Sequence, residues 1–322
     1  MTFISPDLFN EPLAKLDSAQ QISRNNLSKH IEVLASDIGA RSLTRAQEAL
    51  YRAAAYIEQS FEQLNYAVLN QNFNATVVLN DPNNKPISSS MPTRNLIVEI
   101  KGTRVPDEII IVGAHYDTEY SSPGANDNGS GVAALLELAR LFCSATPPAR
   151  TVRFVAFSNE EQPFCDTNDM GSKVYAEQCK QLNENIVAML CLETIGYYAD
   201  KPGTQTFPDE SFLALKHDAG NFISFVSNLE SSELLKKCVA DFRGAVRFPS
   251  IAIAAPTSMR GIDFSDHRNF WRLGYPAIMI TDTAFYRYPH YHQLSDTPDK
   301  IDYNRLALLT HGIFQIVLKL CG

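Results

Sequence analysis

The stretch Ile109-Ile110-Ile111-Val112-Gly113-Ala114-His115-Tyr116-Asp117 decides the fold of this chain. An unbroken apolar run of this length is typical of a strand that is buried on both faces, as in a parallel sheet covered by helices. The run ends on a histidine, and a carboxylate follows two residues later. Ligands of open α/β sheets bind beyond the carboxyl ends of the strands. His115 is therefore a candidate ligand-binding residue, and Asp117 is a candidate partner that orients it.

Four other places carry residues of the same kind. Glu160 and Glu161 follow the apolar run 152–157, Glu193 closes the run 186–192, and Asp127 lies in a glycine-rich turn. The last place is the segment 288–297, where spacing alone leaves both His290 and His292 as candidates. Imidazoles and carboxylates gathered at one edge of a sheet are what zinc requires.

Each of these signals has an ordinary structural explanation when it is taken alone. A histidine at a strand end can bond to a backbone carbonyl, the turn around Asp127 can simply start a helix, and adjacent glutamates are common on solvated loops. Together they favour a site for two metal ions. In such a site one of the two adjacent glutamates can bind an ion while its neighbour stays free to accept a proton.

Strands and helices alternate along the chain, which favours an α/β layer fold with a largely parallel central sheet. Expected strands cover 96–100, 109–114, 152–157, 186–192, 222–226, 251–254 and 277–280. Expected helices cover 131–142, 172–181, 232–242 and 305–320, after N-terminal helices at about 20–65. A polar loop is expected from Asn80 to Pro86 and on through Ser88–Ser90. The turn-rich stretch at about 196–220 is expected to be a long excursion near the site. We interpret residues 1–322 as a single domain.

The composition narrows the classes of function. The chain has 322 residues, of which 45% are hydrophobic, enough for a substantial core. Its net charge is -8 and it has no basic run, which argues against nucleic-acid binding. No stretch has the length and apolarity of a membrane span, and the N-terminus lacks the features of a secretory signal. We therefore expect a cytoplasmic protein, or a secreted or periplasmic one if a signal has been removed.

Several short motifs make the chain resemble a known family. They are His115-Tyr116-Asp117, Gly124-Ala125-Asn126-Asp127-Asn128-Gly129-Ser130-Gly131, Glu160-Glu161, Leu192-Glu193-Thr194-Ile195-Gly196-Tyr197, Ser265-Asp266-His267, and Tyr291-His292 with Asp296-Thr297. With these motifs the chain resembles the di-zinc exopeptidases typified by bacterial leucyl aminopeptidase, which are family twenty-eight of the metallopeptidase clan MH. The resemblance runs from about His30 to the C-terminus. It implies a three-layer α/β/α sandwich around a mixed, mainly parallel sheet.

The resemblance also implies a role for each site residue. Asp127 would bridge two zinc ions, and the peptide bond after it would be cis. His115 and Glu193 would complete the shell of one ion, and Glu161 and His292 that of the other, with cobalt or manganese as alternative metals. The implied catalytic residues are Glu160, as general base and then general acid, Asp117, which would hold His115, and Tyr291, as an oxyanion donor. Many relatives have Asp where this chain has Glu193, a difference that bears on substrate preference.

The activity implied is removal of N-terminal residues from peptides by a metal-activated water. Three alternatives remain open: a carboxypeptidase, a glutaminyl cyclase-like acyltransferase and a non-catalytic binding domain. A carboxypeptidase needs basic residues for the substrate carboxylate, and the candidates in the second half of the chain are Arg243, Arg247, Arg260 and Arg268. Peptides are the expected partners, and neither nucleic acid nor a membrane is expected.

Overall fold

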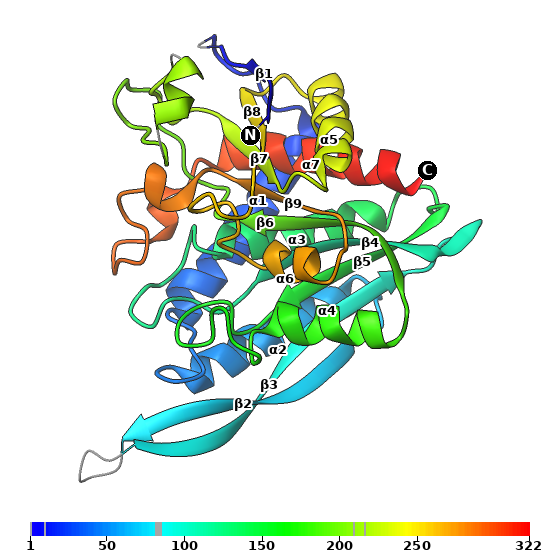
Figure 1. Cartoon of the computed structure of the whole chain (residues 1–322), viewed down its shortest axis with the longest axis vertical. Coiled ribbons are helices and arrows are strands. Elements are labelled where there is room, and N and C mark those ends of the chain that lie inside the picture. Colours follow the sequence, from blue (N-terminus) through cyan, green and yellow to red (C-terminus); the bar gives the residue numbers. More distant parts are fainter. Residues whose placement is uncertain (1, 10, 81–85, 209, 216) are drawn as a thin grey trace.

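The strands of the chain form one mixed sheet. The computed structural model describes residues 2–9, 11–80, 86–208, 210–215 and 217–322, and within them the nine strands follow the order β1-β8-β7-β9-β6-β4-β5-β3-β2 (Figure 1). The strands are β1 (Thr2–Asp7), β2 (Leu69–Asn80), β3 (Pro86–Ile100), β4 (Val105–His115), β5 (Arg150–Phe157), β6 (Asn185–Glu193), β7 (Ile223–Ser227), β8 (Ser250–Ala254) and β9 (Ala277–Thr281).

The centre of the sheet is parallel, and each flank contains antiparallel pairs. β4 pairs in parallel with β5 and β6, and β6 pairs in parallel with β9. β3 and β2 continue the sheet antiparallel on one side, whereas β7 is antiparallel to β9 on the other. The carboxyl ends of β5, β4, β6 and β9 therefore meet at one edge of the sheet, as the sequence predicted.

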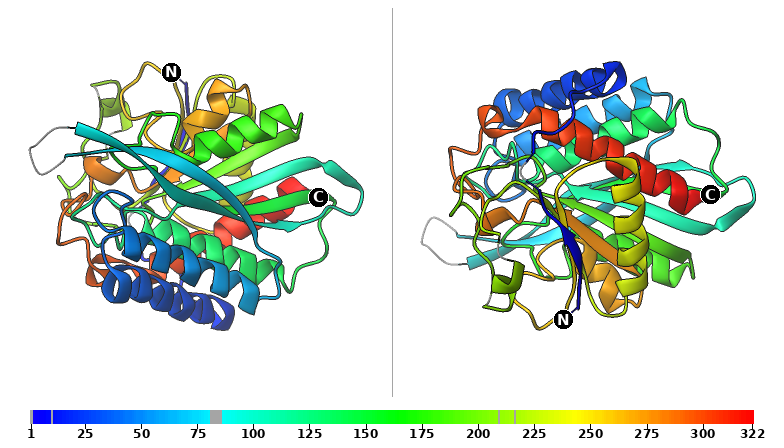
Figure 2. Two further views of the ribbon diagram at one scale, coloured as in Figure 1. Left: turned by 90° about the horizontal axis from the view of Figure 1, so that it is seen from below. Right: turned by 90° about the horizontal axis from the view of Figure 1, so that it is seen from above.

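Helices cover both faces of the sheet, so the predicted three-layer sandwich is confirmed (Figures 1 and 2). One layer contains α1 (Ser18–Glu32), α2 (Gln47–Gln63), α3 (Gly129–Phe142), α5 (Ser232–Ala245) and α7 (Tyr303–Cys321), with the helical turn η1 (Val33–Ile38) after α1. The other layer contains α4 (Gly171–Gln181) and α6 (His267–Arg272). Short 3-10 helices lie at η2 (Glu210–Leu215), η3 (Ala284–Tyr286) and η4 (Pro298–Lys300).

The apolar run of β4 is continuous because its two faces contribute to two different cores. Ile110 and Val112 pack into the core beneath α1, α3 and α7. Ile109 and Ile111 point the other way, into the core beneath α4 and α6. Burial on both faces fixes the register of the strand, since a slip by one residue would exchange the two sets. The position of His115 at the end of β4 is fixed with it.

The prediction of a polar loop was wrong for Ser88–Ser90. They belong to β3 and pair with residues 76–78 of β2, while residues 81–85 of the predicted loop lie outside the described part of the chain. β3 pairs with β5 only from Leu96 to Ile100. The remainder of the β2–β3 ribbon therefore projects past the carboxyl end of β5, as Figure 1 shows at its lower left. On this part of the ribbon Ser88 and Ser90 are exposed, whereas Ala75 and Val77 are buried, so the polar side chains of the exposed face conceal the strand signal.

Two further elements were not predicted, the edge strand β1 and the short helix α6. The described residues of the excursion at 196–220 contain η2 and otherwise little regular structure, in line with the prediction. Among the helices of the described residues, none is both long enough and apolar enough to cross a membrane.

Candidate metal centre

The predicted site residues lie at the ends of elements that share one edge of the sheet. His115 and Glu193 are the last residues of β4 and β6, and Glu160 and Glu161 lie just after β5. Asp127 precedes α3, and His292 lies on the segment between η3 and η4. Residues more than 170 positions apart are thereby brought together, because parallel strands deliver their carboxyl ends to the same place.

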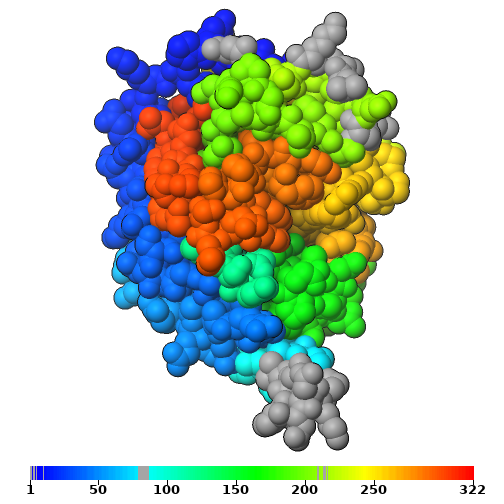
Figure 3. All heavy atoms as spheres, turned by 90° about the vertical axis from the view of Figure 1, so that its left-hand side faces the viewer, coloured from blue at the N-terminus to red at the C-terminus, as the bar shows by residue number. Residues whose placement is uncertain are grey.

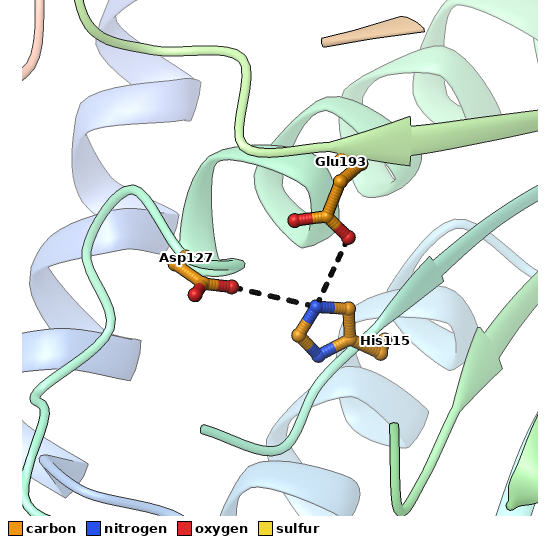
Figure 4. Close-up of side chains that lie close together, drawn as sticks. All are labelled: His115, Asp127 and Glu193. Carbon is orange, nitrogen blue, oxygen red and sulfur yellow. Dashed lines mark ion pairs between the residues drawn. The ribbon is translucent and has the colours of Figure 1, made fainter. Parts of the chain in front are cut away.

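One cluster contains His115, Asp127 and Glu193, all three buried (Figure 4). The Nε2 atom of His115 lies 3.5 Å from Oδ1 of Asp127 and 3.3 Å from Oε2 of Glu193. One ligand atom from each residue lies within 4.8 Å of the others. One imidazole and two carboxylates in this arrangement offer the donor atoms of a zinc site.

A second cluster shares Asp127 with the first. Its other carboxylate oxygen, Oδ2, lies 3.1 Å from Nε2 of His292, and Oε1 of Glu161 lies 3.2 Å from the same nitrogen. His290 is outside this cluster, because its ring is bonded to the hydroxyl of Ser295. Asp127 thus presents one oxygen to each imidazole. That is the geometry of a carboxylate that bridges two cations.

The raised pKa values in the two clusters indicate that their buried carboxylates need positive charge beside them. Burial would lower the pKa of His292, but the carboxylates of Asp127 and Glu161 outweigh it and raise the pKa to about 11. The pKa of His115 is raised in the same way, against burial, by Glu193, Asp117 and Asp127. Burial, with Asp127 beside it, raises the pKa of Glu161 to about 7. Protonated imidazoles therefore balance the buried carboxylates when no metal ion does.

Glu160 lies beside both clusters but belongs to neither. Its Oε2 is 4.0 Å from Nε2 of His115, and its side chain is buried. Burial raises the pKa of this carboxyl well above its usual value, opposed by His115 and reinforced by Glu161, Glu193 and Asp266. A carboxyl group in this setting can hold a proton at neutral pH.

Asp117 holds more than the imidazole for which it was predicted. Its carboxylate accepts hydrogen bonds of 3.0 Å from the backbone N–H groups of Glu160 and Glu161. Nδ1 of His115 lies 3.1 Å from the backbone carbonyl of Asp117 and 3.5 Å from its carboxylate. Asp117 therefore ties the end of β4 to the segment after β5.

Tyr291 packs on the second cluster. Its ring stacks on that of His292, with centroids 3.9 Å apart and planes inclined by 16°. Burial, with the nearby carboxylates of Asp127, Glu161, Glu193 and Glu160, raises the pKa of its hydroxyl well above the usual value. The hydroxyl therefore keeps its proton at neutral pH and can donate a hydrogen bond.

Sequence reasoning missed most of the residues that hold the Asp127 turn. Asp296 accepts from the backbone N–H groups of Asn126 and Asp127 at 2.8 and 3.1 Å. Arg41, which is fully buried, donates to five backbone carbonyls, among them those of Pro123 and Gly124 at the start of the turn. The peptide bond between Asp127 and Asn128 is cis, as the resemblance implied.

Glu193 is held by two hydroxyl groups whose role the sequence did not reveal. The hydroxyl of Thr194 donates to Oε1 and that of Ser265 donates to Oε2, each at 2.6 Å. Thr194 has a φ of 48°, a conformation that is unusual for a β-branched residue and is most often found at functional sites. Both residues lie within the motifs that carry the family resemblance. A hydroxyl group can serve many purposes, so a sequence pattern alone does not reveal which partner it binds.

An apolar pocket opens beside the first cluster. Its empty volume, including the open mouth, is ≈ 710 Å³. Glu193 and Tyr291 form the end next to the clusters. The other walls come from the excursion, from β7, β8 and β9, and from the segments 259–264 and 283–286. Figure 3 shows the face on which the excursion (lime), these later segments (yellow and orange) and the turn after β4 (teal) meet.

Comparison with known proteins identifies the family. The model of Peptidase family M28 matches residues 95–317, more than half of the chain. This chain belongs to peptidase family M28. The Uncharacterized protein YfbL of Escherichia coli (strain K12) is 35% identical to this M28 chain over 303 residues, which cover 92% of this chain and 88% of that protein.

Two solved structures share the fold of this M28 chain. BSAP, a zinc aminopeptidase from Bacillus subtilis, superposes with a TM-score of 0.70 at 17% identity and covers 92% of this chain and 95% of its own. A glutaminyl cyclase from Fimbriiglobus ruber superposes with a TM-score of 0.62 at 20% identity, over 98% of each chain. The predicted family and fold are confirmed, and with the family the predicted class of enzyme, a metallopeptidase.

Proposed function

We propose that this protein is a two-zinc aminopeptidase that removes residues from the free N-termini of peptides. The observation that carries the proposal is the position of Asp127, whose two oxygens face two separate pairs of an imidazole and a carboxylate. A single ion would use only one of these pairs. The proposal includes the interpretation of the chain as one domain, since the ligands come from segments between His115 and His292.

The residues present fit the metal. Oδ2 of Asp127, Oε1 of Glu161 and Nε2 of His292 are buried atoms that face one another and form no further hydrogen bond with the described residues. Buried polar atoms in this state are costly unless something else satisfies them. Nitrogen and carboxylate donors suit zinc, and the same set accepts cobalt or manganese. The zinc of BSAP, a protein of the same fold, supports this choice.

The roles of the ligands follow from the two clusters. His115, Asp127 and Glu193 would hold one ion, and Asp127, Glu161 and His292 the other. When bound, zinc supplies a Lewis acid that lowers the pKa of water and polarises a carbonyl group. The three carboxylates carry charge that burial makes expensive without cations. The charge of the ions and that of the ligands therefore stabilise each other.

Glu160 is placed to move the proton in the reaction. It is not held by the ligand clusters, and its raised pKa lets it take a proton from water and keep it until the amine leaves. Asp117 positions it through the backbone of residues 160 and 161. The Tyr291 hydroxyl would donate a hydrogen bond to the oxygen of the peptide carbonyl as negative charge develops there.

The carboxylate-rich edge favours a free amine as the group recognised. Three of the four arginines proposed for a substrate carboxylate are engaged elsewhere: Arg243 with Ser250, Arg247 with Glu11, and Arg268 with Asp166 and Asp263. A glutaminyl cyclase activity is the second candidate, because a cyclase shares the fold. The second cluster favours hydrolysis, since in the resembled cyclases one metal ion suffices.

The test combines metal content with a substrate panel. The purified protein should hold about two metal ions per chain and should cleave aminoacyl peptides whose amine is free. N-acetylated versions of the same peptides should resist cleavage. Cleavage of the acetylated peptides would instead support a carboxypeptidase. One ion per chain, with cyclisation of an N-terminal glutamine and no peptide hydrolysis, would establish the cyclase.

A further inference from the structure

The apolar pocket beside Glu193 contains a second charge that the proposed chemistry does not use. Of the described residues that line it, only Glu193 and Arg260 are charged. Glu193 is buried at the end next to the metal clusters, whereas Arg260 is exposed. Much of the remaining lining is apolar, with side chains such as Val226, Ile253 and Met279.

Arg260 differs from the other three candidate arginines in having no hydrogen bond or ion pair with any described residue. The segment that carries it is nevertheless ordered by its backbone. The N–H of Met259 bonds to Pro256, and that of Ile262 bonds to Met259. Gly261, with a φ of 87°, lies so close to Tyr286 that a β-carbon there would be 3.3 Å from that ring. The backbone that carries Arg260 is therefore held in place, and its guanidinium has no counter-ion among the described residues.

The two ends of the pocket have opposite polarity. A carboxylate near Glu193, Glu160 and Glu161 would be repelled, and the donors that this part of the lining offers, such as the hydroxyl groups of Ser224 and Tyr291, are uncharged and cannot offset that repulsion. Arg260 is the group that can attract an anion, and the neighbouring apolar surface lowers the local dielectric and strengthens the attraction. Arginine also matches carboxylate geometry with two parallel donors.

We propose that Arg260 is a specificity-determining residue that binds a carboxylate of the substrate at the outer end of this pocket. The inference rests on the proposed function, because it assumes that the substrate amine lies at the metal end. The carboxylate has two sources: an acidic side chain on the first residue, or the C-terminus of a di- or tripeptide. A lysine or arginine side chain on the first residue is disfavoured by the same charge.

The experiment compares matched substrates on the metal-loaded protein. Glutamyl and glutaminyl p-nitroanilide differ only in the charge of the first side chain. Leucyl-leucine and its C-terminal amide differ only in the charge of the C-terminus. Arg260→Met keeps most of the apolar stem and removes the charge. The preference of kcat/KM for the acid over the amide should fall by about tenfold, the size expected for one hydrogen bond to a charged group.

Arg247→Met is the matched control, because it removes an exposed arginine that is paired with Glu11 away from the pocket. It should keep the preference of the unaltered protein. Arg260→Glu should reverse the preference, and higher salt should weaken it in the unaltered protein. Loss of preference in the anilide pair alone assigns the acidic side chain, and loss in the dipeptide pair alone assigns the C-terminus.

Binding of the same pairs to a Glu160→Gln background keeps the test independent of turnover. If neither pair shows a preference, or if Arg260→Met keeps it, the assignment of Arg260 is overturned. Absence of turnover with every free-amine substrate would count against the proposed aminopeptidase instead, and the two failures are therefore distinct. Equal thermal unfolding midpoints of the variants and the unaltered protein exclude misfolding.

Discussion

The two adjacent glutamates just after β5, Glu160 and Glu161, have different surroundings. Glu161 points an oxygen at His292 in the second cluster, whereas Glu160 stays outside both clusters. The backbone carries this division, since Asp117 fixes both N–H groups and the side chains then diverge. On the proposed function, a pair of like charges that would be unfavourable on its own supplies one metal ligand and one proton carrier.

Replacing these two residues separately should therefore give different defects. Glu160→Gln should lower kcat by about 10²- to 10⁴-fold, the usual contribution of a general base, while the metal content is kept. Glu161→Gln should lose metal from the second cluster. Metal analysis and steady-state kinetics on the two variants would show whether the defects differ in this way. Equal metal loss in both would contradict the distinct roles.

Metal binding should depend on pH through the same residues. In the ion-free protein the raised pKa values keep His292 and His115 protonated at neutral pH, whereas a ligating imidazole must be neutral. The protein must therefore release protons when it binds zinc, and its affinity must fall as the pH is lowered. Calorimetry in buffers of different ionisation enthalpy measures this release. An affinity that is constant between pH 6 and pH 8 would contradict it.

At the scale of elements, the turn before α3 and the strand ends around it form one hydrogen-bonded unit. Arg41, on the segment after η1, ties the carbonyl of Tyr116 after β4 to those of Pro123 and Gly124 at the start of the turn. Asp296, close to η4, accepts from the backbone of the turn itself. A segment near the N-terminal helices and another near α7 therefore set the position of Asp127.

Arg41→Met should consequently damage both stability and the site. It removes a donor from five backbone carbonyls, of which only those of Leu34 and Gly124 keep a backbone N–H donor among the described residues, and we expect a loss of about 3 kcal/mol or more in the free energy of unfolding. Urea unfolding of the ion-free protein measures this loss. Arg52→Met, which removes a single bond from an exposed arginine to the carbonyl of Asp37, is the control and should change little. A similar urea unfolding midpoint for both variants would show that the turn around Asp127 is stable without the hydrogen bonds from Arg41.

Sequence patterns predicted the structure best where burial determines which residue types a segment can contain. The strands β4, β5 and β6 and the metal-ligand-type residues at their ends could be predicted, because apolar runs on doubly covered strands leave few alternatives. The β2–β3 ribbon could not, since exposed strands tolerate polar side chains such as Ser88. Arg41 and Ser265 were missed for a different reason. Their partners are backbone carbonyls or distant side chains, which no local pattern records.

For the whole molecule, metal and fold should be coupled. The clusters join β4, β5 and β6 to the turn before α3 and to the segment of His292, so bound ions add cross-links that the unfolded chain lacks. Chelation should lower the thermal unfolding midpoint and zinc should restore it. Free zinc at 100 times its dissociation constant should add about 2.7 kcal/mol per independent site. A thermal unfolding midpoint that changes neither on chelation nor on addition of zinc would mean that the clusters bind no ion.

His292 also has a consequence for how the protein is made in the cell. The second cluster depends on a histidine that is translated long after β4, β5, β6 and the turn before α3. On the proposed function, a nascent chain on the ribosome cannot cut peptides until that late segment has emerged and folded back onto the earlier strands. Under this proposal, synthesis itself keeps the hydrolase inactive while unfinished neighbouring chains are exposed.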